Sequence, residues 1–362
     1  MLDAALSPPA NVIAAVTHAD PWPFYRQLRE ERPLYFDQGL MLWVASSHAV
    51  ISEALHQEML RVRPLSEPVP QVLRGTAAGE VFAQLVRMTD GAFHATHKPE
   101  VAQAARRWTL ADVARASEAA TADVWATRDF MDVLPVQTMA RLLGVPGEQL
   151  ADTCRWVQAF VRGIAPGVDL AATSLAAEAA AALMAQGLAL GLRAVQAANR
   201  IALMQQSLDA TAGLLGQTAL MLAQEPSLAA AADHSLDAMR GFVAEVERHG
   251  APVQNTRRFA ARPLLLAGKT IEAGQGVLLV LASANRDAAL NPQPDQFDPQ
   301  RSTRRSMGFG TGAHACPGSS VAIEMVASCA RQIRAGGQFD ACFGRPAGFQ
   351  PSGNTRIPVF TR

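Results

Sequence analysis

Residues 309–318 read Phe-Gly-Thr-Gly-Ala-His-Ala-Cys-Pro-Gly, and an apolar stretch with a helical pattern, Val321 to Ile333, follows them. Cys316 therefore stands at the end of a glycine-rich loop, just before a helix. Glycines let the backbone pass close to a flat cofactor. The N-terminus of the following helix presents free N–H groups and a positive potential, which favour a thiolate over a thiol. The pattern predicts that Cys316 is a thiolate ligand of a metal centre.

The ten residues resemble the haem-ligand loop of the cytochrome P450 family, Phe-Gly-x-Gly-x-His-x-Cys-x-Gly. The resemblance implies haem b as the cofactor, Cys316 as the proximal ligand of its iron, and Phe309 and Gly310 beside the haem. A cysteine thiolate on haem iron pushes electron density toward O–O cleavage. A lone cysteine before an apolar helix is more often only a small buried residue. Agreement over ten positions with three spaced glycines argues against that alternative.

Composition excludes several classes of function. Of the 362 residues, 49% are hydrophobic and 18% charged, and the 32 Lys and Arg balance the 32 Asp and Glu, which argues against a nucleic-acid or anionic-membrane partner. No signal peptide is expected in residues 1–23, and residues 175–198 read as an Ala-rich helix rather than a membrane span. The cysteines show no metal-binding or disulfide spacing, which indicates a reducing compartment. We expect a soluble, cytoplasmic protein.

The chain reads as one domain over residues 1–362, of the α+β class and mainly α-helical, which is also the arrangement of the P450 fold. No repeat, linker or change in composition divides it. Helices are expected at residues 24–32, 192–224 and 235–248 and over most of 47–210. Strands are expected at residues 34–36 and 41–45, joined as a hairpin, and at residues 263–267 and 276–282, with a turn at Gly268-Lys269.

Glu245 and Arg248 form a Glu-x-x-Arg pair that shares one face of a helix. Alone, such a pair is usually a solvated surface pair. Its position before Cys316 is where the P450 family keeps a Glu-x-x-Arg pair in a core network that supports the haem side of the fold. The resemblance therefore implies a structural role for both residues, and it implies that Arg301 joins the same network.

A haem carries two propionates, which need cationic or hydrogen-bonding partners. By resemblance these partners are His94, Lys98, Arg258 and His314. His94 and Lys98 are one helical turn apart, where the family usually has His-x-x-x-Arg. Lysine departs from that pattern and offers a point charge instead of a bidentate fork. Any one of these residues alone would read as an ordinary surface residue.

The long helix departs from the family in the most consequential place. P450 monooxygenases usually carry an acid followed by threonine in the middle of this helix, and the pair relays protons to iron-bound dioxygen. Here the register, counted from Pro226 and Glu245, places Asp209 at the acid and Ala210 at the threonine, with Thr211 one residue further on. Alanine cannot donate a hydrogen bond or position a water, so general-acid delivery needs another group.

Several explanations for Ala210 stay open. A substrate hydroxyl or an ordered water could replace the threonine, or Ser207 or Thr211 could do so if the helix is locally distorted. The enzyme could instead use peroxide or perform an atypical oxidation. It could also be a catalytically silent haem protein that binds a ligand or a partner. Intact Cys316, Asp209 and propionate partners weigh against loss of activity.

The resemblance implies a haem-thiolate monooxygenase that oxidises an unidentified apolar small molecule in specialised metabolism. The pocket segments expected from family position are largely apolar, with Gln254 among the polar contacts. No fused flavin or iron–sulfur module is recognisable, so electrons are expected from an external ferredoxin or flavodoxin. The basic residues Arg301, Arg304 and Arg305 would form a docking face for such an acidic carrier. A run of this kind is otherwise an ordinary solvated face.

Overall fold

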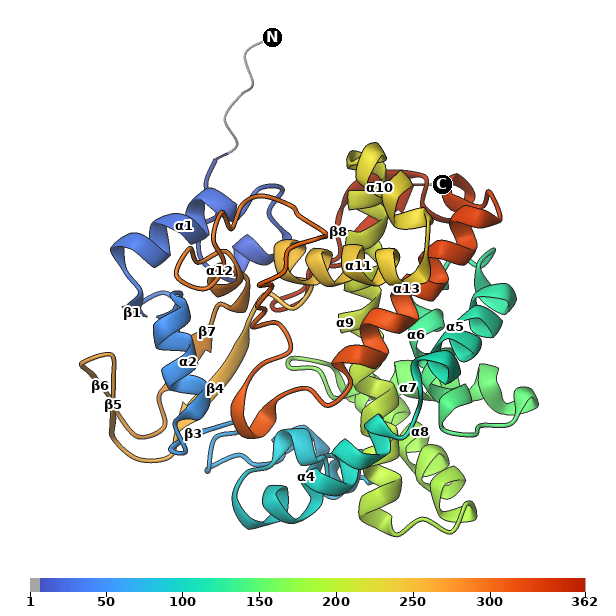
Figure 1. Ribbon diagram of the computed structural model, residues 1–362. Helices are drawn as coiled ribbons and strands as arrows, with labels where there is room; N and C mark the ends of the chain where they lie inside the picture. Colours follow the sequence, from blue (N-terminus) through green and yellow to red (C-terminus); the bar gives the residue numbers. More distant parts are fainter. Residues whose placement is uncertain (1–6, 362) are drawn as a thin grey trace. The chain divides into compact units, whose positions relative to one another are not determined.

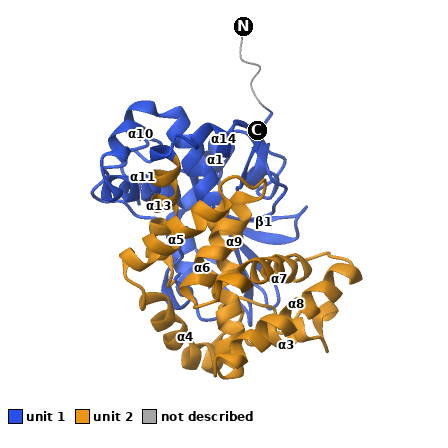
Figure 2. Ribbon diagram, turned by 90° about the vertical axis from the view of Figure 1, so that its right-hand side faces the viewer, with its two compact units in different colours: residues 1–60, 213–316, 334–362 blue, residues 61–212, 317–333 orange. Residues whose placement is uncertain are grey.

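The protein is described here from a computed structural model that covers residues 7–361 (Figure 1). Its contacts group into two units. The first comprises residues 1–60, 213–316 and 334–362, and the second comprises residues 61–212 and 317–333 (Figure 2). Each unit is assembled from segments that are discontinuous in the sequence, so neither corresponds to a single continuous piece of chain. One domain over residues 1–362 stays a prediction.

The first unit is built on a mixed sheet of strand order β1-β2-β7-β4-β3. The predicted hairpin is confirmed, because β1 (Leu34–Asp37) and β2 (Leu42–Ala45) pair antiparallel. β2 then pairs parallel with β7 (Gly276–Leu279), which pairs antiparallel with β4 (Thr256–Ala260). β3 (Leu60–Arg61) is the last strand in this order. A separate hairpin joins β5 (Leu264–Leu266) to β6 (Lys269–Ile271), and Gly268, with φ +74°, forms the predicted turn between them.

The two faces of this sheet bury different helices. Successive side chains of a strand point to opposite faces. On β7, Leu278 packs in a cluster with Tyr25 and Leu28 of α1 (Trp22–Glu31). Its neighbours Val277 and Leu279 pack in another cluster, with α2 (His48–His56). The sheet is therefore covered on both sides, which explains why β7 reads as a continuous apolar run.

Further helices and one hairpin complete the first unit. They are α10 (Pro226–Asp233), α11 (Leu236–Gly250), α12 (Leu281–Asn285), α14 (Phe339–Phe343) and the antiparallel pair β8 (Arg345–Phe349) and β9 (Pro358–Thr361). Ser235 caps α11 by accepting a hydrogen bond from the backbone N–H of Ala238. The predicted strand 276–282 ends early, since the chain turns into α12 at Leu281.

The second unit is helical. It contains α3 (Ala77–Ala83), α4 (Gly91–Arg106), α5 (Leu110–Val124), α6 (Phe130–Leu142), α7 (Leu150–Gly163), α8 (Leu170–Ala189), the first part of α9 (Ala194–Gln224) and most of α13 (Ser319–Ala335). A capping box between Thr109 and Asp112 starts α5. The core cluster joins Phe160 of α7, Leu183 of α8 and Ile201 of α9.

The Ala-rich stretch 175–198 is not one helix, and this prediction is wrong. The chain breaks between α8 and α9, where Gly191 adopts φ +76°. A left-handed residue of this kind ends a helix, and glycine adopts it without a steric penalty. Among the described helices, none alone is long and apolar enough to span a membrane, and α8 with α9 passes such a test only as a pair bent by 119°.

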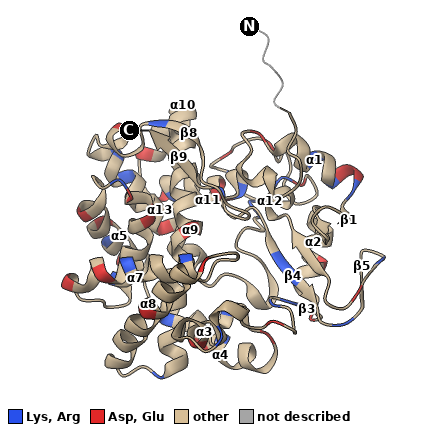
Figure 3. Ribbon diagram, turned by 180° about the vertical axis from the view of Figure 1, so that it is seen from behind, with Lys and Arg blue, Asp and Glu red and all other residues tan. Residues whose placement is uncertain are grey.

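Acidic and basic residues are interspersed along the ribbon (Figure 3).

Candidate functional site

The cysteine loop folds back on itself in the first unit. The backbone N–H of Cys316 donates to the carbonyl of Phe309 at 2.8 Å, and that of Gly310 donates to the carbonyl of Met307 at the same distance. Gly310 and Gly312 have φ of +65° and +69°, which only glycine adopts readily. A Cβ on Gly312 would also lie 3.0 Å from the carbonyl oxygen of Leu55. Gly310 and Gly312 are therefore required by the turn itself, whereas the structure leaves room for a side chain at Gly318.

Two buried asparagines hold the chain just before this loop. Asn285, at the end of α12, accepts a hydrogen bond through Oδ1 from the backbone N–H of Met307 at 2.6 Å. Asn291 accepts one from the N–H of Arg305 at 3.1 Å and donates to the carbonyl of Arg305 at 2.9 Å. Both side chains are fully buried. No sequence pattern marks Asn291, because its partners are backbone groups, which every residue carries.

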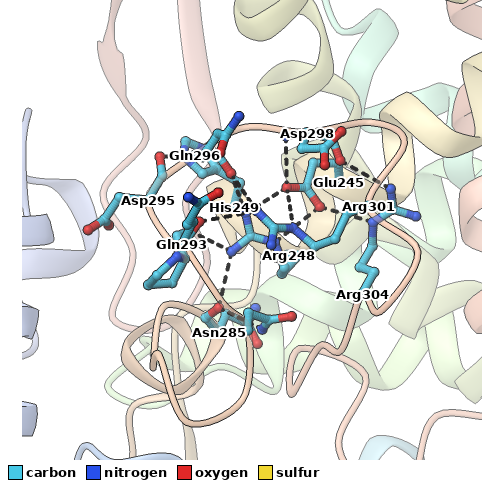
Figure 4. Close-up of polar contacts among 12 residues, drawn as sticks. Glu245, Arg248, His249, Asn285, Gln293, Asp295, Gln296, Asp298, Arg301 and Arg304 are labelled. Atoms are coloured by element: carbon cyan, nitrogen blue, oxygen red, sulfur yellow. Dashed lines mark hydrogen bonds and ion pairs between the residues drawn. The ribbon is translucent and has the colours of Figure 1, made fainter.

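The predicted Glu245–Arg248 pair is confirmed and lies in the core (Figure 4). Arg248 Nη2 donates to Glu245 Oε1 at 2.6 Å and Nε to Oε2 at 3.1 Å. Arg301 joins as predicted, with Nε 3.3 Å from Glu245 Oε1. Burial alone would raise the pKa of Glu245, but Arg248, with smaller contributions from the backbone N–H of Asp298 and from Arg304, outweighs burial and lowers the pKa. Arg248 also donates to the carbonyls of Asn285, Pro294 and Gln296, so one buried fork fixes the segment that leads to the cysteine loop.

The predicted docking role of the basic run needs correction. Arg304 Nε donates to Glu245 Oε2 at 2.9 Å, and its side chain is only 20% exposed. Arg301 is 8% exposed, so only Arg305 of the three is exposed. The sequence shows three arginines near one another. The carboxylate of Glu245 can accept several hydrogen bonds, and it pairs with two of these arginines, Arg301 and Arg304, inside the protein. A face of three arginines therefore does not exist in this unit.

Glu247 is a buried carboxyl that the sequence interpretation missed. It lies beside Ser306 and Gly308, so close that a Cβ on Gly308 would be 2.1 Å from its Oε1. Burial raises the pKa of Glu247 to about 7, although Ser306, Arg248 and Arg304 act in the opposite direction. The carboxyl is thus partly protonated near neutral pH, directly beneath the segment that leads into the cysteine loop.

Glu247→Gln is expected to change the pH dependence of stability. The folded pKa lies above the ordinary value of 4.5, so the wild type loses stability as pH rises from about 4.5 to 7. Glutamine removes that loss, and the variant should be more stable than the wild type by up to about 3 kcal/mol at pH 8 but by less than about 1 kcal/mol at pH 5. Urea unfolding at the two pH values measures this. An equal difference at both would contradict the raised pKa.

The predicted propionate partners are divided between the units. Arg258, on β4, is 7% exposed and donates to the carbonyl of Arg257 at 2.8 Å. It belongs to the first unit, as do His314, Phe309, Gly310 and Cys316. His94 and Lys98 belong to the second unit, where they lie one turn apart on α4 and His94 is buried. The propionate role of all four stays a prediction.

The acid position of α9 has a cationic neighbour that the sequence interpretation missed. Burial raises the pKa of Asp209, and the nearby charge of Arg87 acts to lower it. Arg87 comes from a short 3-10 turn (Val86–Met88), and its Nε donates to Gln205 Oε1 at 3.3 Å. Gln205 precedes Asp209 by one helical turn, so both lie on one face of α9. No sequence motif marks Arg87, because its effect on Asp209 depends on where the 3-10 turn that carries it packs against α9.

The residues around Asp209 narrow the choices for proton delivery. α9 is an unbroken α-helix from Ala194 to Gln224. Thr211 is 3% exposed, while Asp209 keeps accessible surface. The hydroxyl of Ser207 donates to the carbonyl of Met204 at 2.7 Å. The local distortion that Ser207 or Thr211 would need in order to replace the threonine is therefore absent from α9.

Gln254 is not a pocket residue, contrary to the prediction. It is fully buried, accepts a hydrogen bond from the Tyr25 hydroxyl at 2.9 Å, and donates to the carbonyl of Ala251 at 2.6 Å. Its polar groups are therefore used within the first unit, where they connect α1 to the segment after α11. The sequence could not distinguish this internal role of Gln254 from contact with a ligand, because the residue type is the same in both cases and only its hydrogen-bond partners differ.

The four cysteines, all within the described range, differ in a way that fits a haem thiolate. None of these four described cysteines is in a disulfide, and Cys316 alone among them is exposed. Burial raises the pKa of Cys154 to about 12, which keeps it a thiol. In the described part of the chain, no group of three or more His, Cys, Asp or Glu side chains could hold a bare metal ion. The exposed thiol of Cys316 suits a centre with a single protein thiolate, as in haem.

Sequence comparison identifies relatives of two kinds. The cytochrome P450 family matches residues 222–333. A putative cytochrome P450 140 of Mycobacterium bovis is 27% identical, over 84% of this chain and 80% of that protein. Other matches are local: the 20-oxo-5-O-mycaminosyltylactone 23-monooxygenase of Streptomyces fradiae is 34% identical over 34% of this chain, which covers 30% of that enzyme.

Solved structures show the same fold. P450BioI, crystallised with an acyl carrier protein ligated to hexadec-9Z-enoic acid, has a TM-score of 0.77 at 22% identity, over 94% of this chain and 97% of that chain. CalO2 has a TM-score of 0.77 at 18% identity, over 94% of both chains. The mainly helical α+β fold predicted from the sequence is therefore confirmed. The chain thus has the cytochrome P450 fold, its residues 222–333 match the cytochrome P450 family, and its relatives include P450 monooxygenases.

Proposed function

We propose that this protein is a haem-thiolate monooxygenase in which Cys316 ligates the iron of haem b. The observation that carries the proposal is the exposed Cys316 thiol on a glycine-shaped loop, held by the buried Glu245 network. Bound there, the haem would supply activation of dioxygen, with insertion of one oxygen atom into the substrate and release of the other as water. Phe309 and Gly310 would lie beside it, and His94, Lys98, Arg258 and His314 would bind its propionates.

The substrate we propose is an apolar small organic molecule of specialised metabolism. Two facts support this class. The expected pocket segments are largely apolar, and the local relative from Streptomyces fradiae acts, by its name, on a mycaminosyltylactone. We further propose a cytoplasmic location and an external ferredoxin or flavodoxin as electron donor. Arg305 would remain available for docking of such an acidic carrier, whereas Arg301 and Arg304 are paired with Glu245.

Asp209 would pass on the two protons that the reaction consumes, one after the other. Burial raises the pKa of Asp209 above its ordinary value and the charge of Arg87 acts to lower it, which suits a carboxyl that passes on a proton. Ala210 contributes no hydroxyl, so the next donor would be a hydroxyl of the substrate or a water that the substrate orders. In this mechanism, coupling of electrons to product depends on which substrate is bound.

Ala210→Thr is expected to change that coupling. A threonine hydroxyl at this position would supply the missing donor, so the fraction of electrons recovered as product should rise about tenfold or more with substrates that lack a hydroxyl. Ala210→Val is the matched control, since valine has the shape of threonine without the hydroxyl. Product formed per reductant consumed is the measurement. Unchanged coupling in Ala210→Thr, or an equal change in Ala210→Val, would contradict the role of the hydroxyl.

The proposed function is tested by a spectral titration followed by turnover. The ferric protein is titrated with a panel of apolar molecules, and a low-to-high-spin shift identifies ligands that displace iron-bound water. Those ligands are then tested with ferredoxin and reductase, and separately with hydrogen peroxide. Product with the reductase supports the monooxygenase. Product with peroxide alone supports a peroxide-using enzyme, which Ala210 favours. No product with either, despite a thiolate-type spectrum, supports a catalytically silent haem protein.

A further inference from the structure

A cavity of about 370 Å³ lies within the second unit, among α4, the end of α6, the α8–α9 connection and the start of α9. Apolar side chains form much of its wall, among them Leu143, Val195 and Leu203. Its volume falls in the range of small-molecule pockets, roughly 300–1,000 Å³. None of the residues predicted to bind haem or to deliver protons lines it.

Arg200 of α9 also lines this cavity, and its guanidinium is incompletely paired. The residue is 4% exposed, and Nη1 donates to Gln186 Oε1 at 2.9 Å. Nε and Nη2 are buried with no hydrogen-bond acceptor among the described residues. Burial lowers the pKa of Arg200. A buried charged donor without an acceptor is strongly destabilising, so an acceptor at this edge would be stabilising.

The other charged groups in the wall favour an anion. Glu100 is the acidic residue of the wall, and both its oxygens accept hydrogen bonds from Arg193 Nη2, at 2.9 and 3.0 Å. Arg107 lines the cavity as well, and so does His97, whose buried Nδ1 has no hydrogen-bond partner among residues 7–361. The wall therefore holds two guanidinium groups and an imidazole against one carboxylate that is already paired.

We propose that this cavity is a second binding site, for a small carboxylate with an apolar tail. The Nε–Nη2 edge of an arginine matches the two oxygens of a carboxylate and binds it bidentately. The tail would lie against Leu143, Val195 and Leu203. Both nitrogens are covered in the structure, so the guanidinium turns toward the cavity when the ligand enters. Arg200 lies on the same unbroken helix as Asp209 and Ala210, about two and a half turns before Asp209.

The test uses octanoate and 1-octanol with the purified haem-loaded protein. Isothermal titration calorimetry measures binding, and the absorption spectrum is recorded on the same samples. Octanoate should bind at one site with little change of spin state, and octanol should bind about tenfold or more weakly, because it cannot pair with the guanidinium. Arg200→Gln should weaken the binding of octanoate by about tenfold or more and leave the affinity for octanol unchanged. Leu203→Phe should weaken both by filling the cavity.

Two further arms keep the outcome decisive. Arg200→Lys keeps the charge but not the fork, so it should also weaken octanoate, and it serves if Arg200→Gln does not fold. Equal octanoate affinity in the wild type and a folded Arg200 variant overturns the proposal. Octanoate binding that shifts the spin state and is indifferent to Arg200 and Leu203 also overturns it, because the ligand is then in the substrate pocket. These results leave the monooxygenase proposal untouched.

Discussion

Cys316→Ser should abolish the thiolate-type spectrum of the reduced carbon monoxide complex and reduce reductase-supported turnover to background. Serine has nearly the same shape, so the loop that Cys316 closes through its backbone N–H should persist. A serine hydroxyl is not deprotonated near neutral pH, so it cannot replace the thiolate that directs electron density toward O–O cleavage. Absorption spectra and turnover are measured on protein reconstituted with haem b.

Cys154→Ala is the matched control for this substitution. Cys154 is buried in α7, and its raised pKa keeps it a thiol. Its removal should cost about 1–2 kcal/mol of stability through lost packing but leave the thiolate-type spectrum intact. A thiolate-type spectrum in Cys316→Ser, or its loss in Cys154→Ala, would show that the iron ligand is not Cys316.

Arg248→Leu should destabilise the protein by about 3–5 kcal/mol, the usual effect of removing one partner of a buried ion pair. Glu245 would lose its bidentate partner, and the carbonyls of Pro294 and Gln296 would lose a buried donor. Those carbonyls belong to the segment that leads to the cysteine loop, so haem should also dissociate faster. Urea unfolding of the haem-free protein measures the first effect, and transfer of haem to an acceptor protein measures the second.

Arg115→Leu is the control, because Asp112 and Arg115 have the same i, i+3 spacing on α5. Their side chains are 37% and 70% exposed, whereas those of Glu245 and Arg248 are fully buried. An exposed pair contributes little, so this substitution should change stability by about 0.5 kcal/mol or less. Equal effects at Arg248 and Arg115 would contradict the structural role of the buried network.

The sequence predicted best where a local pattern is sufficient. The glycines of the cysteine loop predict the tight turn, and the helical spacing of the apolar residues that follow it predicts α13. The hairpin of β1 and β2 followed from its alternating residues and its turn. The Ala-rich stretch failed because composition favours helix throughout it, whereas one left-handed glycine decides where the helix ends. Arg301 and Arg304 both pair with Glu245, but only Arg301 was predicted, since their separation along the chain does not reveal a shared partner.

The sequence by itself determined the family resemblance, the candidate thiolate Cys316, and the replacement of a hydroxyl by Ala210, because each is a matter of residue type at a position in a local motif. Only the tertiary structure decided which charges are buried. Glu247 has a pKa of about 7 because protein atoms replace water around it. Within the described part of the chain, Arg200 lacks acceptors for two nitrogens because of how its neighbours pack. Desolvation depends on every atom nearby in space, and most of those atoms are distant in sequence.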